Sequence, residues 1–237
     1  MDSREIILEL QSKASEKYKE NVVRMGIPQE QCIGVSTGEV RNIAKRIEKS
    51  NKLAFDLWNS GYHEAKLLAV LVFDKKGCSI SDIEKLMSEV ISWDLCDHLC
   101  KNLIVKMKGY EELIYKWIES THIYKKRAAY TLIATSVVHN KKISNDILDA
   151  YLELIREDSD IEHEHVKKAV SWALREIGKR DFDYNEKALL VAHELLNCGN
   201  KTQKWIAKDA MKELENLVKV EGRTRLISTK TQMGNNH

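Results

Sequence analysis

The sequence contains little of the material from which turns and strands are usually built. A single proline, Pro28, and ten glycines occur in 237 residues. All-β and multi-stranded folds need turn residues at short intervals, so this shortage argues against them. We therefore expect helices, and the 43% of apolar side chains is enough for a substantial core.

Long hydrophobic runs and a cysteine framework are also missing. The first residues, MDSREIILELQSKASEKYKEN, are charged throughout, and no window approaches the roughly 18 uninterrupted apolar residues of a membrane span. The five cysteines are an odd number and lie scattered along the chain. We expect a cytosolic protein with no membrane partner and no disulfide scaffold.

An excess of charge of either sign is absent as well. The 38 Lys and Arg residues nearly balance the 36 Asp and Glu residues, and the net charge is +2. Bulk charge therefore gives no reason to expect nucleic acid, and any such case depends on where the basic residues lie. The sequence has neither a glycine-rich phosphate loop nor a G-x-S-x-G elbow, which argues against nucleotide hydrolysis and serine-hydrolase chemistry.

The apolar residues that are present follow helical spacing. Residues 3–24 and 37–50 carry them three and four positions apart, with Gly26, Pro28 and Gly34 between. From about residue 53, amphipathic stretches alternate with polar joints such as DKKGCS, SWD, HNKKIS and GKRDFD. We expect two N-terminal helices followed by a series of helix pairs.

A recurring segment predicts that these pairs are repeats. A basic residue, small residues and an apolar run return in HEAKLLAVLV, KKRAAYTLIA, VKKAVSWAL and QKWIAKDAM. Aligned on Ala65, Ala128, Ala169 and Ala207, the segments are 63, 41 and 38 residues apart. The last two steps suit HEAT-type repeats, and the first leaves room for one more pair containing residues 81–108.

The expected fold is thus all-α, with HEAT-like helix pairs stacked into a curved α-solenoid. Residues 1–220 would form a single repeat domain, and residues 221–237 a polar, basic and mobile tail. An irregular helical bundle that uses alanine for close packing is the alternative.

Equivalent repeat positions are basic. One helix of each pair lines the inner surface of a solenoid, so its cations would form a stripe along a concave groove. These cations are Lys66, Lys125, Lys126, Arg127, Lys167, Lys168, Arg175, Lys179, Arg180, Lys204 and Lys208. Acids such as Glu111, Glu112, Glu153, Glu157 and Glu194 fall on the companion helices. Solvated helix faces with ordinary ion pairs would produce the same pattern without a ligand.

Two segments place tryptophan beside charged residues. In SWDLCDHLCKNL, Ser92 can cap a helix that begins at Trp93, and Asp97 lies four residues later on the same face. In KKAVSWALREIGKR, Trp172 stands among lysines and arginines. Each residue also has a purely structural alternative. Both tryptophans could pack in the core, and Asp97 could form an ion pair with Lys101.

These motifs resemble the DNA alkylation repair (AlkD-like) family of HEAT-repeat DNA glycosylases. W-D-x-x-D, K-R-A-A and K-K-A-V-x-W-A-L-R look like successive signature segments of that family, and the similarity spans about residues 20–215. By motif position, the resemblance implies that Trp93, Asp97 and Trp172 form the active cleft. It also implies that Arg127 belongs to the DNA-binding cleft.

The activity implied by the resemblance is hydrolysis of the N-glycosidic bond of N3- or N7-alkylated purines in duplex DNA. Asp97 would stabilise the positive charge that develops on the deoxyribose, and the tryptophans would pack against the cationic nucleotide. The implied chemistry requires no metal or other cofactor, and we expect a monomer. The expected phosphate-binding residues are Arg127, Arg175, Lys125, Lys126, Lys167, Lys168, Lys179 and Lys204.

Two positions depart from the glycosylase pattern. Met25 lies near the place of an early tyrosine, and Ser92 replaces an additional tryptophan before the W-D pair. The family also contains AlkF- and AlkG-type branches that bind DNA structures without the same excision activity. Noncatalytic binding of branched or distorted DNA is therefore the second hypothesis, and a solenoid that grips an acidic peptide is the third.

Overall fold

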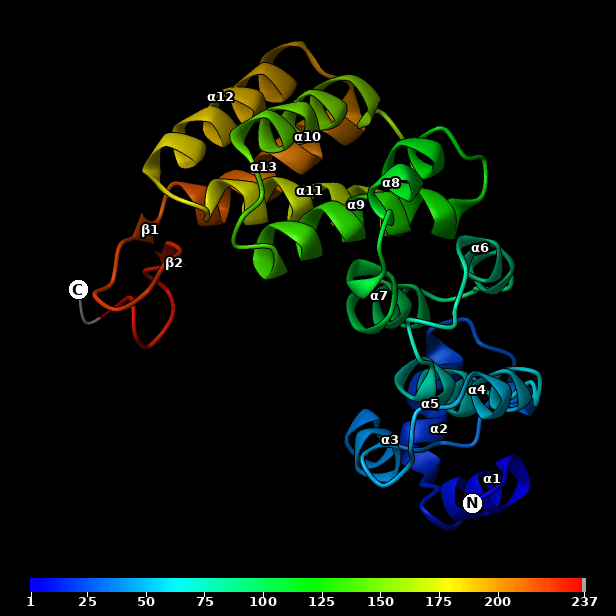
Figure 1. The fold of residues 1–237 in the computed structure, drawn as a ribbon. Coiled ribbons are helices and arrows are strands. Elements are labelled where there is room, and N and C mark those ends of the chain that lie inside the picture. Colours follow the sequence, from blue (N-terminus) through cyan, green and yellow to red (C-terminus); the bar gives the residue numbers. More distant parts are fainter. Residues whose placement is uncertain (236–237) are drawn as a thin grey trace. The chain divides into compact units, whose positions relative to one another are not determined.

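The computed structural model describes residues 1–235, and this part of the chain is almost entirely helical (Figure 1). It contains thirteen α-helices, two short 3₁₀ helices and one pair of two-residue strands. The all-α prediction is confirmed. Within the described residues, no helix is both long and apolar enough to cross a membrane. The chain divides into two compact units, Met1–Tyr110 (unit 1) and Glu111–His237 (unit 2).

Unit 1 is built from seven α-helices among its described residues. They are α1 (Ser3–Ser12), α2 (Glu16–Arg24), α3 (Thr37–Ala44), α4 (Asn51–Trp58), α5 (His63–Val72), α6 (Ile80–Ser88) and α7 (Trp93–Asn102), with 3₁₀ helices η1 (Gln29–Gln31) and η2 (Ile104–Lys106).

The expected helix over residues 3–24 is two helices, which corrects the sequence prediction. The backbone N–H of Ser15 donates to the carbonyl of Gly34 at 2.8 Å, so the chain turns between α1 and α2. The helix expected over 37–50 is also shorter and ends at Ala44. Ser50 then starts α4 by accepting a hydrogen bond from the N–H of Leu53 at 3.3 Å.

A buried carboxylate fixes the N-terminal loop of unit 1. Glu64 has no exposed surface and accepts hydrogen bonds from the N–H groups of Ile33, Gly34 and Val35 at 2.9, 2.6 and 3.2 Å. Gly34 has a φ of +97°, and a Cβ there would lie 2.7 Å from the Ser15 carbonyl oxygen. Only glycine suits this crossing of the two chain segments.

Three long-range polar contacts in unit 1 share one sequence separation. Trp58 Nε1 donates to Glu89 at 2.7 Å, and this pair is 31 residues apart. The Ile33 to Glu64 bond has the same separation. The helix pair expected within residues 81–108 is α6 and α7, so this prediction is confirmed. A constant separation is the mark of stacked repeats.

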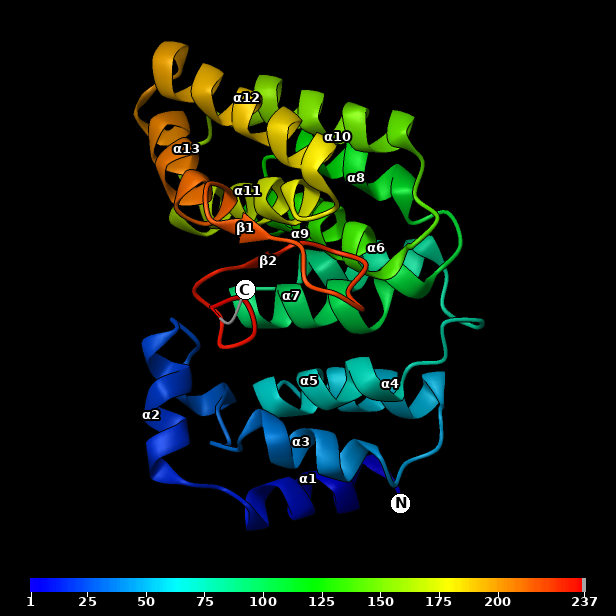
Figure 2. The same ribbon diagram turned by 90° about the vertical axis from the view of Figure 1, so that its left-hand side faces the viewer.

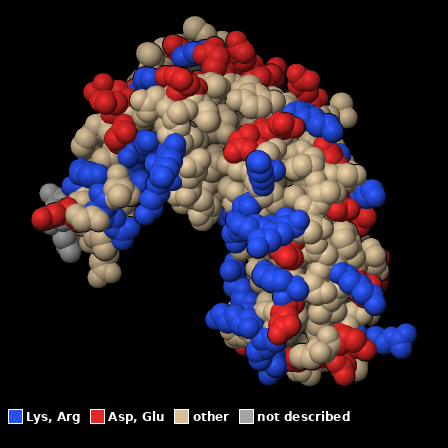
Figure 3. All heavy atoms as spheres, viewed as in Figure 1, with Lys and Arg blue, Asp and Glu red and all other residues tan. Residues whose placement is uncertain are grey.

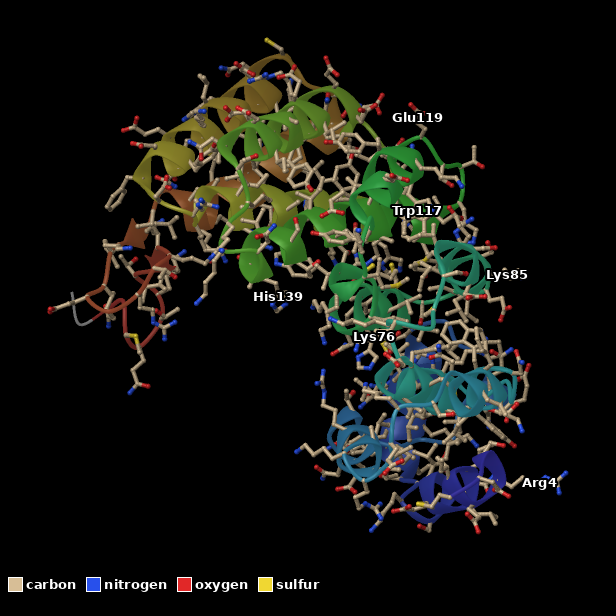
Figure 4. All side chains as sticks on the ribbon, viewed as in Figure 1. Arg4, Lys76, Lys85, Trp117, Glu119 and His139 are labelled. Carbon is tan, nitrogen blue, oxygen red and sulfur yellow. The ribbon has the colours of Figure 1, made fainter. Side chains whose placement is uncertain are left out.

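Unit 2 has two layers of helices. Its elements are α8 (Glu111–Ile118), α9 (Ile123–His139), α10 (Asn145–Asp158), α11 (Glu164–Gly178), α12 (Phe182–Cys198), α13 (Lys201–Leu214), β1 (Leu217–Val218) and β2 (Ile227–Ser228). Helices α9, α11 and α13 lie side by side, with α10 and α12 in a second layer (Figures 1 and 2). Trp117 of α8 is buried in the core of the unit, whereas Glu119 points away from it (Figure 4).

Five polar pairs that connect elements of unit 2 are each 38 residues apart in the sequence. The pairs are Arg127 with the His165 carbonyl, Ser171 with Asp209, Arg175 with Glu213, Arg156 with Glu194, and Lys187 with Asp149. The alanines used above to align the repeats, Ala128, Ala169 and Ala207, are buried where these helices approach one another. HEAT-like helix pairs are therefore confirmed, whereas the concave basic groove and the single domain over residues 1–220 stay predictions.

The segment after α13 packs against α9 and α11 of the same unit, which the sequence pattern did not indicate. β1 and β2 pair antiparallel, and the N–H of Leu226 donates to the Lys179 carbonyl at 2.9 Å. Arg225 donates to the Val137 carbonyl and to the Glu176 carboxylate at 2.9 and 2.8 Å. Residues 236 and 237 of the expected mobile tail lie outside the described residues.

Glu64→Ala is expected to destabilise the protein by at least about 3 kcal/mol, because it leaves three buried N–H donors without their acceptor. Urea unfolding followed by circular dichroism measures the change. The exposed carboxylate Asp56 on α4 supplies the control, and Asp56→Ala should change the stability by less than about 0.5 kcal/mol. Equal effects of the two substitutions would show that Glu64 does not fix the loop.

Candidate nucleic-acid interface

The first predicted pair of site residues lies on α7 in unit 1. Trp93 is the first residue of the helix and is 39% exposed, and Asp97 follows one turn later with only 9% exposure. The helix starts where the sequence predicted, but the side chain of Ser92 makes no capping hydrogen bond. The pair therefore combines an accessible indole with a largely buried carboxylate on one helix face.

A polar contact between helices holds α7 in place. Asp94 Oδ2 lies 2.8 Å from Nε2 of His63, a histidine on α5 with 3% exposure. Burial by itself would raise the pKa of Asp94, but the hydrogen bond and the charge of His63 outweigh it and lower the pKa. Asp94 anchors the first turn of α7, and this anchor fixes the position of Asp97 one turn later.

Trp172 lies on α11 in unit 2 and is held by a carboxylate. Its Nε1 donates to Glu176 at 3.2 Å, and Glu176 also lies 2.6 Å from Lys179 and 2.8 Å from Arg225. Glu176 is itself only 9% exposed, so it joins α11 to the C-terminal segment. Because Trp172 belongs to unit 2, its convergence with Trp93 and Asp97 stays a prediction.

The predicted phosphate-binding residues share one layer of unit 2. They are Lys125, Lys126 and Arg127 on α9, Lys167, Lys168 and Arg175 on α11, Lys179 directly after α11, and Lys204 on α13. The acids expected on the companion helices, Glu111, Glu112, Glu153, Glu157 and Glu194, do lie on α8, α10 and α12. Asp and Glu gather over α10 and α12 in Figure 3. The predicted placement of these cations and these acids on different helices of unit 2 is confirmed.

Several of these cations also have structural partners. Lys167 and Lys168 lie 2.5 and 2.9 Å from Glu164. Arg175 and Lys179 both contact Glu213, at 3.1 and 3.2 Å. Arg127 is only 6% exposed and donates to the His165 carbonyl, so it ties α9 to α11. Among the residues that the structure describes, Lys204 is exposed and forms no ion pair.

Unit 1 contains a group of cations that the sequence reasoning missed. A hollow of 510 Å³ is lined by Lys75, Lys76, Lys106 and Lys108, which we call the unit 1 lysine cluster. Burial and the charges of Lys49, Lys75 and Arg41 lower the pKa of Lys106. Figure 3 shows Lys and Arg gathered along one side of this unit, over α3 and α7.

The sequence does carry a signal for this cluster. Lys75 and Lys106 are 31 residues apart, which is the repeat separation of unit 1. They therefore occupy equivalent positions after the second helix of successive pairs. The repeat alignment on alanine was too coarse to show this, because its first step spanned two pairs at once.

A family model described as "DNA alkylation repair enzyme" matches residues 6–214. The chain belongs to this DNA alkylation repair family. A search of curated proteins finds no match.

Solved structures of similar fold agree with the family. One, described as "a new family of proteins related to the HEAT-like repeat DNA glycosylases with affinity for branched DNA structures", is 21% identical with a TM-score of 0.75, over 100% of this chain and 94% of that one. Two Streptococcus mutans proteins have TM-scores of 0.54 over 89% of this chain and 98% of theirs. They are smu.31, 20% identical, and AlkD2, 19% identical. At these identities, the structural likeness establishes the shared HEAT-like fold.

The buried side chains beside Asp97 in this DNA alkylation repair family member do not form a metal site. Within residues 1–235, no group of three or more His, Cys, Asp and Glu side chains could hold a metal ion. His98 instead lies next to Asn102, whose Nδ2 is 3.2 Å from His98 Nδ1. Burial, followed by the charge of Arg41, lowers the pKa of His98 from 6.5 to about 4.

The stability of this family member should fall between pH 6.5 and pH 4. In that window the unfolded chain binds a proton at His98 and the folded chain does not, so protonation favours unfolding. The shift corresponds to roughly 3 kcal/mol lost across the window, at about 1.4 kcal/mol per pKa unit. Urea unfolding at several pH values should show a shallower pH dependence for His98→Gln than for wild type.

The exposed His139 at the end of α9 provides the matched control (Figure 4). His139→Gln should keep the wild-type pH dependence. If His98→Gln keeps it as well, His98 is not the group that makes the folded state sensitive to acid.

Proposed function

We propose that this protein binds duplex DNA through cations of both units and hydrolyses the N-glycosidic bond of N3- or N7-alkylated purines. The observation that carries the proposal is the largely buried Asp97 one turn from the accessible indole of Trp93 on α7. Family membership over residues 6–214 supplies the context in which this pair acts on DNA.

In the proposed reaction, the bond between C1′ of the deoxyribose and the purine nitrogen breaks. Its electron pair moves to the purine and neutralises the positive charge of the alkylated base, so no proton has to be donated to the leaving group. The Asp97 carboxylate stabilises the cationic sugar and orients the attacking water, whose oxygen bonds to C1′ and whose proton is released. The 9% exposure of Asp97 strengthens this effect, because water screens a buried charge poorly.

The tryptophans have a positioning role in this proposal. An indole face attracts a cation, and a purine alkylated at N3 or N7 is cationic. Trp93 presents an accessible ring. The Nε1 of Trp172 is engaged by Glu176, so Trp172 would act through its ring face.

Phosphate contacts would orient the DNA without reading its sequence. In unit 2 the proposed contacts are Arg127, Arg175, Lys125, Lys126, Lys167, Lys168, Lys179 and Lys204. The unit 1 lysine cluster adds a second set. Exposed lysines without an acid partner, such as Lys204, would contribute most, because a paired lysine is already partly neutralised by its carboxylate.

A second candidate function is noncatalytic binding of branched or distorted DNA on the same scaffold. The solved structure with a TM-score of 0.75 is described as belonging to proteins with affinity for branched DNA. The presence of Ser92 before the W-D pair also favours this candidate. It predicts DNA binding without release of a base.

Asp97→Asn is expected to abolish release of N7-methylguanine and N3-methyladenine from methylated duplex DNA while leaving duplex binding within about threefold of wild type. The amide keeps the size of the side chain but lacks the negative charge that stabilises the sugar cation. Chromatography of the released bases and fluorescence anisotropy of labelled DNA measure the two properties.

Asp56→Asn is the control, because Asp56 is an exposed carboxylate on α4 of the same unit and has no part in the proposed chemistry. It should retain release at the wild-type level. Unchanged release by Asp97→Asn would rule out the proposed mechanism. Tight binding without release by wild type or either variant would favour the second candidate.

The double variant Lys75→Gln, Lys106→Gln should weaken duplex binding and reduce the slope of log K against log salt concentration by about 1 to 2. Each lysine that neutralises a phosphate contributes about 0.9 to that slope. Anisotropy titrations at several salt concentrations measure it. Lys85→Gln, an exposed lysine on α6, should leave the slope unchanged (Figure 4). An unchanged slope in the double variant would remove the unit 1 lysine cluster from the interface.

A further inference from the structure

A second hollow lies within unit 2, where the end of α12 meets the first turns of α11 and α13. Its volume is 780 Å³, within the roughly 300–1,000 Å³ of pockets that hold small molecules. Residues lining it include Lys167, Lys201, Lys204, Trp205 and Lys208. Trp205, Lys201 and Lys208 have no part in the mechanism proposed above.

The turn from α12 to α13 forms one wall of the pocket, and local contacts fix its conformation. A Cβ at Gly199 would overlap the Leu195 carbonyl oxygen and lie 2.6 Å from Cβ of Gln203, so the turn from α12 to α13 requires glycine. Asn200 then caps α13, and Asn200 and Gln203 exchange two hydrogen bonds of 2.9 Å. The first turns of α13 are therefore well anchored.

The helical spacing of α13 presents cations and an aromatic ring together. Lys201, Lys204 and Lys208 are three and four residues apart, and Trp205 lies on the same side. All three lysines are exposed, and none forms an ion pair with any residue in the described part of the chain. The acids that line the pocket are Glu162 and Glu164, and Glu164 is already paired with Lys167 and Lys168. The pocket is therefore positive.

Trp205 supplies the second recognition element. Its ring is half-buried, and Nζ of Lys167 lies 4.5 Å from the ring centroid. This cation–π contact holds the indole in one orientation. A fixed aromatic ring beside unpaired lysines is the combination by which proteins bind single-stranded nucleic acid, in which a base stacks on the ring and cations contact the backbone.

We propose that this pocket binds an unpaired nucleotide of DNA, with the base stacked on Trp205 and the flanking phosphates bound by Lys201, Lys204 and Lys208. The inference deepens the proposed DNA-binding function. It assigns to the start of α13 a preference for single-stranded segments, such as those that occur at branches and gaps.

The test measures binding of an eight-residue oligothymidylate to the full chain by quenching of tryptophan fluorescence and by anisotropy of the labelled strand. Trp205→Ala should weaken binding roughly tenfold or more, because stacking of the base is lost. Trp205→Phe keeps a stacking ring and should bind nearly as well as wild type, while most of the quenching disappears. The triple variant Lys201→Gln, Lys204→Gln, Lys208→Gln should lower the single-strand salt slope by about 2.

Lys142→Gln, an exposed lysine in the loop before α10, is the control and should match wild type. Unchanged oligothymidylate affinity in Trp205→Ala would overturn the inference. Equal binding of an abasic oligomer, or full competition by inorganic pyrophosphate, would also overturn it in favour of a simple phosphate site. Preference for polyglutamate over the oligonucleotide would overturn it in favour of an acidic protein partner.

Base release and binding of methylated duplex DNA, measured on the same samples, decide the proposed function separately. If Trp205→Ala loses only oligothymidylate binding, both proposals are supported. If wild type binds the oligonucleotide through Trp205 but neither binds nor cleaves duplex DNA, the inference stands and the proposed duplex function fails.

Discussion

Within each unit of this protein, polar bonds between residues that lie one repeat apart in the sequence connect neighbouring helix pairs. In unit 1 that separation is 31 residues, as between Trp58 and Glu89. In unit 2 it is 38 residues, as between Arg175 and Glu213. A polar bond across an otherwise apolar contact permits only one alignment, since a shifted alignment would leave a buried polar group without a partner. This alignment decides which side chains lie next to one another within each unit.

The proposed chemistry depends on the same bonds. The contact between His63 and Asp94 spans one repeat of unit 1 and sets the first turn of α7, on which Trp93 and Asp97 lie. In unit 2 a different contact has this role: Glu176 lies one turn after Trp172 on α11 and accepts hydrogen bonds from Trp172 and Arg225. Residues that would meet DNA are therefore supported by residues that belong to the scaffold, and many proposed phosphate ligands serve both purposes.

The repeated pattern of small and apolar residues was enough to predict the helical class, the helix pairs and the location of cations and acids on opposite helices of unit 2. Those features depend on spacing along one helix, which a sequence displays directly. The break between α1 and α2 was missed, because it depends on Gly34, a residue distant in sequence that bonds to Ser15.

Features that depend on contacts between helices could not be predicted from the sequence either. The composition of the C-terminal segment indicated mobility, but Leu226 and Arg225 find partners on α9 and around the end of α11. Ion pairing of Arg175 and Lys179 could not be read from their positions alone, because their partner Glu213 lies on another helix. The approach of Lys75 to Lys106 became recognisable only once the 31-residue repeat was known.

In the proposed function, DNA contacts α9, α11, α13 and the unit 1 lysine cluster. It does not contact α10, α12 or α6. Covalent labelling of lysines, read by mass spectrometry with and without duplex DNA, tests it directly. The account predicts that DNA protects Lys126 on α9, Lys204 on α13 and Lys106 in the unit 1 lysine cluster, while Lys187 on α12 and Lys85 on α6 stay reactive. Equal protection of both sets, or stronger protection of Lys187 and Lys85, would contradict it.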